Sequence, residues 1–289
     1  MLFQIGEGFS GREGLQFWQI YFVTTPHRWI TLALVFLDRE RLGQRSFAFL
    51  AIAAATIFVC LGVRLTTGTL TCLLTIDYVW NAWHFAAQHH GIYRIYIRRI
   101  QPAITNSAAL EKWAMRFFLL YVILRVAGAT WPYVALEQAL QIVDWLILAI
   151  PAWLMLRQFL LPQRSLGGTI YLTSVTALYV SLLAAVHLNR PALVLSLATA
   201  SALFHATEYL ALVAWNVHGR SAAMPDRLGI MSYLVPRWGL MLGTFILVLG
   251  AGGWLLNQHF MRPWLLINVI VAFLHYAYDG LIWRQRGRP

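Results

Sequence analysis

Long apolar runs constrain the fold of this chain more than any other feature. Each is about 18–25 residues, enough for a helix to cross the roughly 30 Å hydrocarbon core of a bilayer. Only 11% of the 289 residues are charged, whereas a soluble domain averages about 25%. In lipid the backbone must satisfy its own hydrogen bonds, which leaves helices or a closed barrel, and continuous runs lack the alternation of barrel strands. The sequence therefore predicts an all-α, polytopic integral membrane helical bundle.

The apolar runs divide into nine expected transmembrane helices. We place them at residues 15–37, 46–63, 69–93, 113–132, 136–159, 168–188, 192–215, 231–256 and 263–283. Pro151 and Pro236 fall inside runs and are expected to kink them. With no repeat or low-complexity tract, we expect one transmembrane domain over residues 1–289. No basic segment precedes an apolar one at the N-terminus, so we expect no cleaved signal peptide.

The positive charges support this count of spans. With the N-terminus outside, the inner side holds sixteen Lys and Arg residues and the outer side four. The inner residues are Arg39, Arg41, Arg45, Arg94, Arg98, Arg99, Lys112, Arg116, Arg157, Arg164, Arg220, Arg227, Arg237, Arg284, Arg286 and Arg288, and the outer ones are Arg12, Arg64, Arg190 and Arg262. This excess follows the positive-inside rule and predicts an outer N-terminus and an inner C-terminus. The net charge of +11 thus reflects the loops, and we expect no nucleic-acid partner.

Four histidines share one expected depth. His27, His84, His205 and His275 lie in spans one, three, seven and nine, which all run from outside to inside. They precede the next inner arginine by 12, 10, 15 and 9 residues, counted to Arg39, Arg94, Arg220 and Arg284. At about 1.5 Å per residue they lie about 14–22 Å above the inner boundary. Histidine is the commonest metal ligand, so the pattern predicts a metal centre. The alternative is four separate core histidines, each hydrogen-bonded to a neighbour.

Polar residues accompany these histidines on the same helix faces. Span three carries a polar stripe, spaced i, i+4, i+7 and i+11, which we expect to face the protein interior. The stripe consists of Asp77, Asn81, His84 and Gln88. Carboxylates follow two of the histidines by one turn and can accept their second N–H or bind the metal. Two further histidines lie nearer the inner boundary, where they would serve a second ion. The additional ligands or ligand-orienting residues are Asp77, Asn81, Gln88, His89, His90, Glu208 and Asp279.

The expected metal follows from the ligands and from the lipid surroundings. Imidazoles suit iron, zinc or copper, and a site buried in lipid suits a hydrophobic substrate. Oxygen chemistry on hydrocarbon commonly relies on an iron cofactor, so we infer one or two Fe²⁺ ions, with other transition metals as alternatives. Nearby aromatic residues are expected to line a substrate pocket or, alternatively, to face lipid. They are Trp80, Trp83, Phe85, Tyr209 and Tyr276.

Four short segments resemble a known family in their order along the chain. They are TPHRW with His27, WHFAAQHHG with His84, FHATEYL with His205 and LHYAYDG with His275. This layout resembles the Brp/Blh-type carotene oxygenases of bacteria and archaea, polytopic membrane proteins that cleave β-carotene to retinal with oxygen. It is also similar to uncharacterised bacterial membrane proteins with a His-Phe-x-x-Gln segment and a closing His-Tyr…Asp…Ile-Trp-Arg segment. The sequence departs from the carotene enzymes in the residues after the first two histidines and, by one residue, in the spacing from His275 to Asp279.

The resemblance implies a function as well as a site. It implies iron held by the four histidines, in an oxygenase or oxidase that acts on a lipid or isoprenoid in a bacterial cytoplasmic membrane. One alternative is a pigment- or haem-binding subunit, although a haem needs two axial ligands rather than four. Another is a transporter with the stripe of span three lining its path, although paired broken helices are not evident.

Overall fold

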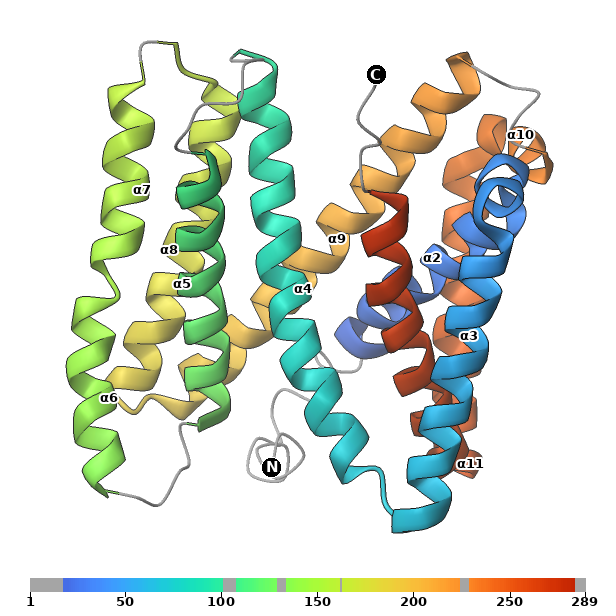
Figure 1. The fold of residues 1–289 in the computed structure, drawn as a ribbon, viewed down its shortest axis with the longest axis horizontal. Helices are drawn as coiled ribbons and strands as arrows, with labels where there is room; N and C mark the ends of the chain where they lie inside the picture. The colour runs from blue at the N-terminus through green and yellow to red at the C-terminus, as the bar shows by residue number, and fades with distance from the viewer. Residues whose placement is uncertain (1–17, 101–107, 129–133, 162, 224–228, 284–289) are drawn as a thin grey trace. The chain divides into compact units, whose positions relative to one another are not determined.

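The computed structural model describes residues 18–100, 108–128, 134–161, 163–223 and 229–283. Within these ranges the chain is helical and contains no strand, so the predicted all-α class is confirmed there. The elements in chain order (Figure 1) are η1 Gln19–Thr24, α2 Thr25–Leu37, α3 Arg39–Thr67, α4 Thr71–Arg98, α5 Ala108–Gly128, α6 Val134–Leu146, α7 Ala149–Leu160, α8 Leu166–His187, α9 Pro191–Ala223, α10 Ile230–Leu234, η3 Val235–Arg237 and α11 Trp238–Ile282.

Several helices begin or end at residues that favour a break. Asp38 has an extended backbone, and its carboxylate accepts hydrogen bonds from the amides of Glu40 at 3.1 Å and Arg41 at 3.2 Å, so α3 begins after it. α3 ends before Gly68, whose φ of 68° glycine adopts without steric cost. Pro191 opens α9, where its missing N–H removes no intrahelical bond.

The two prolines predicted to kink apolar runs lie at breaks. α6 and α7 are separated just ahead of Pro151, which has no N–H to offer the Ile147 carbonyl. That carbonyl accepts a hydrogen bond from the Ile150 amide at 3.1 Å instead. Pro236 lies in the short 3₁₀ turn η3. Both predicted kinks are therefore confirmed.

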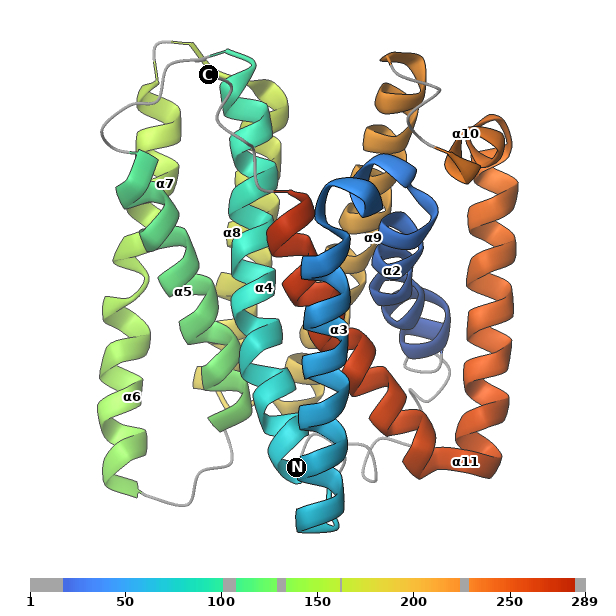
Figure 2. The ribbon, with the colours of Figure 1, turned by 45° about the vertical axis from the view of Figure 1, so that its right-hand side comes forward.

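α11 is bent into two arms, which Figure 2 shows clearly. Phe260 has non-helical angles (φ −136°, ψ 46°), and Pro263 follows three residues later. The bend falls between the eighth and ninth predicted spans. A Cβ added at Gly253 on the first arm would lie 2.6 Å from the ring of Trp264 on the second. The absence of a side chain at Gly253 therefore allows the two arms to approach each other.

Six helical segments of the described chain are long and apolar enough to span a membrane. They are Gln19–Leu37, Arg45–Thr67, Leu136–Leu160, Leu166–His187, Pro191–Ala223 and Ile230–Ile282. α4 and α5 occupy predicted spans three and four but are outside this set. α4 carries the polar stripe, and α5 carries Glu111, Lys112, Arg116 and Arg125. By length and composition these apolar helices are compatible with an integral membrane protein, and the count of nine stays a prediction.

The chain divides into two compact units. Within the described residues, unit 1 contains 81–201 and unit 2 contains 18–80 and 202–283, so the division falls inside α4 and α9. In unit 1, α5, α7 and α8 pack against one another and α6 packs against α8 (Figure 1). In unit 2, α11 packs against η1, α2 and α3. The expectation of one domain over the whole chain stays a prediction.

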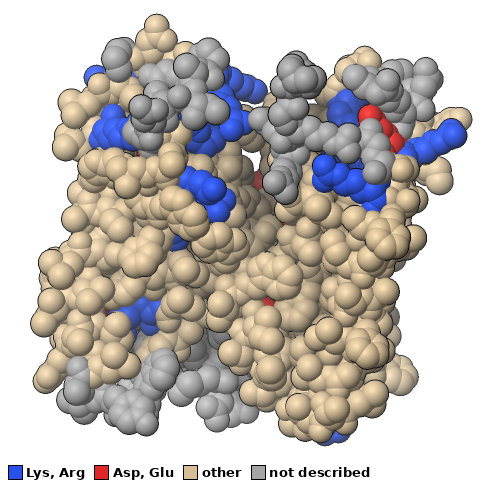
Figure 3. Space-filling model, viewed as in Figure 1, with Lys and Arg blue, Asp and Glu red and all other residues tan. Residues whose placement is uncertain are grey.

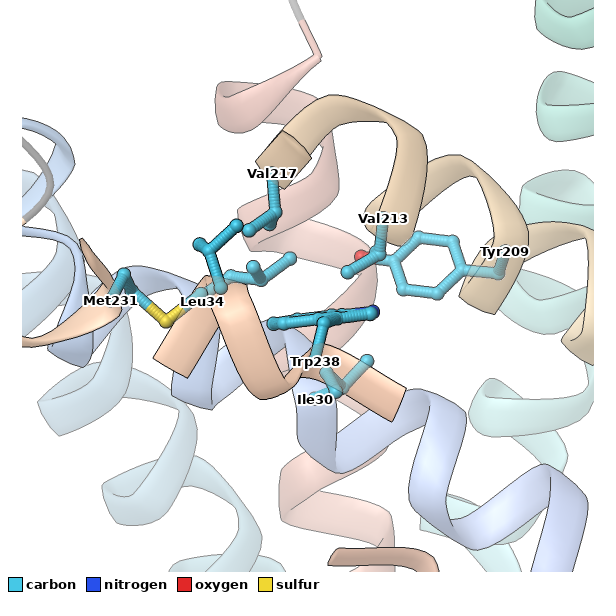
Figure 4. Packing of buried hydrophobic residues seen from close by; sticks show 8 residues of the cluster. Ile30, Leu34, Tyr209, Val213, Val217, Met231 and Trp238 are labelled. Carbon is cyan, nitrogen blue, oxygen red and sulfur yellow. The ribbon is translucent and has the colours of Figure 1, made fainter. Parts of the chain in front are cut away.

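One apolar cluster of unit 2 joins α2, α9 and the start of α11 (Figure 4). The Trp238 indole lies among side chains that include Ile30 of α2 and Val213 of α9. Ile30 follows His27 by three residues and Val213 follows His205 by eight, so each lies on the same helix face as that histidine. Packing of this cluster therefore directs both histidines into the interior of unit 2.

A second cluster fixes the last arm of α11 against α2 and α3. Leu274 and Tyr278 pack with Val35 of α2 and Phe49 of α3. The Tyr278 hydroxyl also donates a hydrogen bond to the Phe49 carbonyl at 2.8 Å. Leu274 and Tyr278 flank His275 along the chain, so the apolar packing of this cluster holds His275 close to α2.

Charged side chains lie towards helix ends in each unit. In unit 1, Lys and Arg gather where α7 ends and α8 begins (Figure 3). Glu111 forms ion pairs there with Arg94, at 3.5 Å, and with Arg157. In unit 2, basic and acidic side chains lie together near the start of α3 (Figure 3). On the face that Figure 3 shows, few charged side chains lie between these ends, as expected of helices in lipid.

Candidate metal centre

Three histidines from three helices converge in the described part of unit 2. His27 of α2, His205 of α9 and His275 of α11 are 2%, 0% and 0% exposed. The ring centroid of His27 lies 5.3 Å from that of His205 and 5.1 Å from that of His275. One nitrogen of each ring lies within 4.8 Å of a nitrogen of the other two. The structure thus brings together three of the four histidines predicted as ligands.

The spacing of these nitrogens fits a transition-metal ion. Two nitrogens bound about 2.1 Å from one ion lie at most about 4.2 Å apart. The nitrogens of this site lie at most 4.8 Å apart, so they exceed this limit by at most about 0.6 Å, a difference that small rotations of the rings would close. Imidazole nitrogens suit iron, zinc, copper and nickel. The donor set is therefore suited to such an ion, and it comes from three helices whose packing already holds the rings together.

A chain of hydrogen bonds leads away from His275. The His275 Nδ1 lies 2.7 Å from the Thr31 Oγ1. The Thr31 Oγ1 lies 2.6 Å from the Tyr209 hydroxyl, which donates to the Asp279 Oδ1 at 2.6 Å. All four residues are buried. Asp279 thus lies in contact with the site through two hydroxyls, and its other oxygen is 3.9 Å from the His275 Nδ1.

Tyr276 and Asp77 form a neighbouring polar contact. The Tyr276 hydroxyl donates to the Asp77 Oδ1 at 2.9 Å, and an Arg28 nitrogen lies 3.8 Å from the other Asp77 oxygen. The Tyr276 ring lies 5.5 Å from the His275 ring and 5.5 Å from the Trp80 ring. Trp80 is 37% exposed. Aromatic side chains therefore extend from the histidines to the surface of unit 2, and Asp77 contacts Tyr276 and Arg28.

The remaining predicted residues of α4 belong to unit 1. His84, Phe85, His89 and His90 are buried, Asn81 and Gln88 are partly buried, and Trp83 is 36% exposed. The three converging histidines belong to unit 2, so a role for His84 as the fourth ligand stays a prediction. Glu208, one turn after His205 on α9, is partly buried, and its predicted role likewise stays a prediction.

His89 lies between two tyrosines of α8. Its Nδ1 is 2.9 Å from the Tyr171 hydroxyl and its Nε2 is 3.5 Å from the Tyr179 hydroxyl. Tyr179 in turn accepts a hydrogen bond from Ser201 at 2.9 Å. Hydroxyl groups therefore contact both ring nitrogens of His89, one of the two histidines that the sequence suggested for a second ion.

Another buried polar cluster of unit 1 surrounds Arg125. Its guanidinium contacts Asp144 at 3.2 Å and Glu137 at 2.6 Å. Tyr121 donates to Asp144 at 2.6 Å, and the His187 Nδ1 lies 3.2 Å from the same carboxylate. Arg125 lies within the predicted span 113–132, where the sequence alone indicates no partner for it. Glu137 and Asp144 are seven residues apart on α6, a spacing that shares one helix face and was the available signal.

An ion-pair network closes one end of unit 2. Arg220 of α9 pairs with Asp38 and, at 2.8 Å, with Glu40. Arg41 lies 3.4 Å from Asp38 and donates to the Asn216 amide oxygen at 2.7 Å. Burial, followed by the neighbouring Arg220 cation, lowers the pKa of Arg41. These contacts tie α3 to α9 beyond the histidines.

Thr31 is the residue of this site that the sequence did not reveal. It follows His27 by four residues, so it lies one turn further along the same face of α2. A threonine in an apolar run can face lipid, because its hydroxyl can bond to a carbonyl of its own helix. The sequence therefore does not distinguish a lipid-facing threonine from one that contacts the site. Its distance of 2.7 Å from His275 depends on packing between α2 and α11, which the sequence alone does not specify.

Comparison with family models, with curated proteins and with solved structures finds no match to this chain.

Proposed function

We propose that this protein is a membrane-embedded, iron-dependent oxygenase or oxidase acting on a hydrophobic lipid or isoprenoid. The observation that carries the proposal is the convergence of His27, His205 and His275, buried and with their nitrogens within 4.8 Å. A transition metal is the partner that several imidazoles suit best. Iron bound there would supply the activation of O₂. The apolar helices around the site favour a substrate that arrives from the bilayer.

The proposed arrangement has nine spans, with the N-terminus outside and the C-terminus inside. The nine spans are the five apolar segments between Gln19 and Ala223, α4, α5 and the two arms of α11. In support, each unit taken by itself has a basic end, as the positive-inside rule requires. We propose a bacterial cytoplasmic membrane, in keeping with the resemblance to Brp/Blh-type enzymes. His84 is proposed as a fourth ligand.

Elemental analysis of the purified protein tests the metal centre. Protein extracted in mild detergent from iron-supplemented cells should contain about one iron per chain, the stoichiometry of a single three- or four-ligand site. A His27→Ala/His205→Ala/His275→Ala variant is the matched control. The proposal fails if the wild-type protein contains no more transition metal than this variant.

The rival functions predict different measurements. A haem or pigment protein would show a Soret or Q band in its visible spectrum, whereas the proposed enzyme would not. A transporter would carry ions or solutes into proteoliposomes without consuming O₂. The proposed enzyme should consume O₂ when supplied with carotenoid or isoprenoid lipids, and the triple histidine variant should not.

Labelling of single cysteines tests the topology. Thr69 and Arg190 lie in exposed connections proposed to be outside, and Arg164 lies in one proposed to be inside. In a chain without Cys60 and Cys72, Thr69→Cys and Arg190→Cys should react with an impermeant maleimide on intact cells. Arg164→Cys should react only after the membrane is opened. The opposite pattern, or a mixed one, would contradict the nine-span arrangement.

A further inference from the structure

We infer that Thr31, Tyr209 and Asp279 are positioning residues that fix the tautomer and orientation of His275, so that its Nε2 faces the metal. The inference rests on the proposed metal centre and extends it. It starts from the unbroken series of short contacts from the His275 Nδ1 through Thr31 and Tyr209 to Asp279. These residues come from α2, α9 and α11, the same helices that supply the three histidines.

The direction of each hydrogen bond follows from the number of protons. The Tyr209 hydroxyl donates its only proton to the Asp279 carboxylate. Its oxygen must then accept the proton of Thr31 across the 2.6 Å contact. Thr31, having donated its proton, can only accept from His275 across 2.7 Å. The Nδ1 of His275 therefore carries the hydrogen, and the Nε2 has the lone pair that a metal ion requires.

Burial is the reason that this series of hydrogen bonds can fix the orientation of His275. Thr31, Tyr209 and His275 are each at most 1% exposed, so no bulk water replaces a lost partner. A flipped or tautomerised ring would leave the Thr31 hydroxyl and its partners mismatched. Metal-bound histidines commonly pass their second N–H to a carboxylate or carbonyl, and loss of that partner typically lowers metal affinity about 10–100-fold. Here the Thr31 and Tyr209 hydroxyls connect the Asp279 carboxylate to the His275 Nδ1.

The matched variants separate positioning from general packing. Thr31→Val keeps the shape of the side chain and removes the hydroxyl, and Thr31→Ser restores it. Tyr209→Phe removes the central hydroxyl. Tyr278→Phe is its control, because Tyr278 is also fully buried and bonded through its hydroxyl, in this case to the Phe49 carbonyl at 2.8 Å. Tyr278 lies three residues from His275 and outside the hydrogen-bond chain.

Binding of Co²⁺ to the metal-free protein gives two readouts besides activity. Affinity is measured by competition with a chelator, and the visible bands of bound Co²⁺ report its ligand geometry. Thr31→Val and Tyr209→Phe should each bind Co²⁺ about 10–100-fold more weakly and alter the bands. Thr31→Ser and Tyr278→Phe should bind as the wild type does. Thermal unfolding confirms that each variant is folded, and the Thr31 pair decides the question if Tyr209→Phe does not fold.

Two failures can be told apart. If the wild type binds Co²⁺ and Thr31→Val binds it equally well with unchanged bands, the positioning role is wrong and the metal centre stands. If the wild type itself binds no Co²⁺, the metal centre is wrong and the positioning role falls with it. Weak binding by Thr31→Ser as well as Thr31→Val would also overturn the inference, because the hydroxyl would then not be what matters.

Discussion

Unit 1 and unit 2 both bury polar side chains among apolar helices, but the partners of those side chains differ between the two units. In unit 1, Arg125 contacts two carboxylates and His89 lies between two tyrosine hydroxyls. Each group there meets a chemical complement. In unit 2, three imidazoles converge on one another. Groups of the same kind do not neutralise each other, and their lone pairs suit a shared cation.

The difference shows which buried polar residues indicate a function. Polar residues in membrane spans are costly and often functional, yet a complementary set such as that of Arg125 has its charges paired without a ligand. For histidines that converge on one point, we propose a metal ion bound between them. The variants below test whether the unit 1 cluster contributes to stability alone and the unit 2 cluster to metal binding.

The largest expected effect on stability is in unit 1. Arg125→Met would leave the buried Asp144 carboxylate without its cation, and removal of one partner from a buried ion pair typically costs about 3–5 kcal/mol. Denaturation in detergent should show this loss in the free energy of unfolding, while the folded fraction keeps the metal content of the wild type. Arg190→Met, at an exposed position, is the control. A loss no larger than that of the control would contradict the structural role.

His205→Ala should act on metal binding. It removes one converging imidazole, and the affinity should fall at least about 100-fold, the upper range for loss of a residue that only supports a ligand. This corresponds to about 2.7 kcal/mol. His218→Ala on the same helix is the control, because His218 is exposed and lies outside the group of converging histidines. Equal metal binding by both variants would remove His205 from the site.

Gly253→Ala tests whether the bend of α11 matters to unit 2. The added Cβ would lie 2.6 Å from the Trp264 ring, and such overpacking typically costs about 1–3 kcal/mol. Thermal unfolding of the purified protein measures the loss. Gly252→Ala is an adjacent control, since a Cβ there meets nothing within 4 Å. If both variants unfold alike, close approach of the two arms is not required.

The smallest expected effect is that of Tyr171→Phe in unit 1. The change removes the hydroxyl 2.9 Å from the His89 Nδ1, and a buried polar atom that loses its partner costs about 1–3 kcal/mol. The free energy of unfolding should fall at the lower end of that range, and metal content should stay constant. A loss of bound metal in this variant would connect His89 to a metal site and break the contrast between the units.

The apolar runs were enough to predict the helical class, and the prolines were enough to predict the breaks at Pro151 and Pro236. The number of spans was harder to predict from the sequence. α4 and α5 are helices where spans were predicted, yet their polar residues leave them outside the set of strongly apolar helices. Sequence hydropathy identifies a helix surrounded by lipid better than one whose polar face is covered by protein.

The candidate site was partly predictable because depth can be counted along helices. Counting residues to the inner arginines placed His27, His205 and His275 at one level, and these rings converge. Rotation about each helix axis and contacts between helices cannot be counted in that way. Thr31 was therefore missed, and Tyr209, predicted for a substrate pocket, lies fully buried between Thr31 and Asp279.

X-ray absorption at the iron edge of the purified protein tests the central claim most directly. A centre built from His27, His205 and His275 should show nitrogen neighbours at about 2.1 Å, with outer-shell scattering from at least three imidazole rings. That scattering should weaken in His205→Ala and stay unchanged in His218→Ala. A spectrum without imidazole scattering, or one that is the same in both variants, would contradict the account.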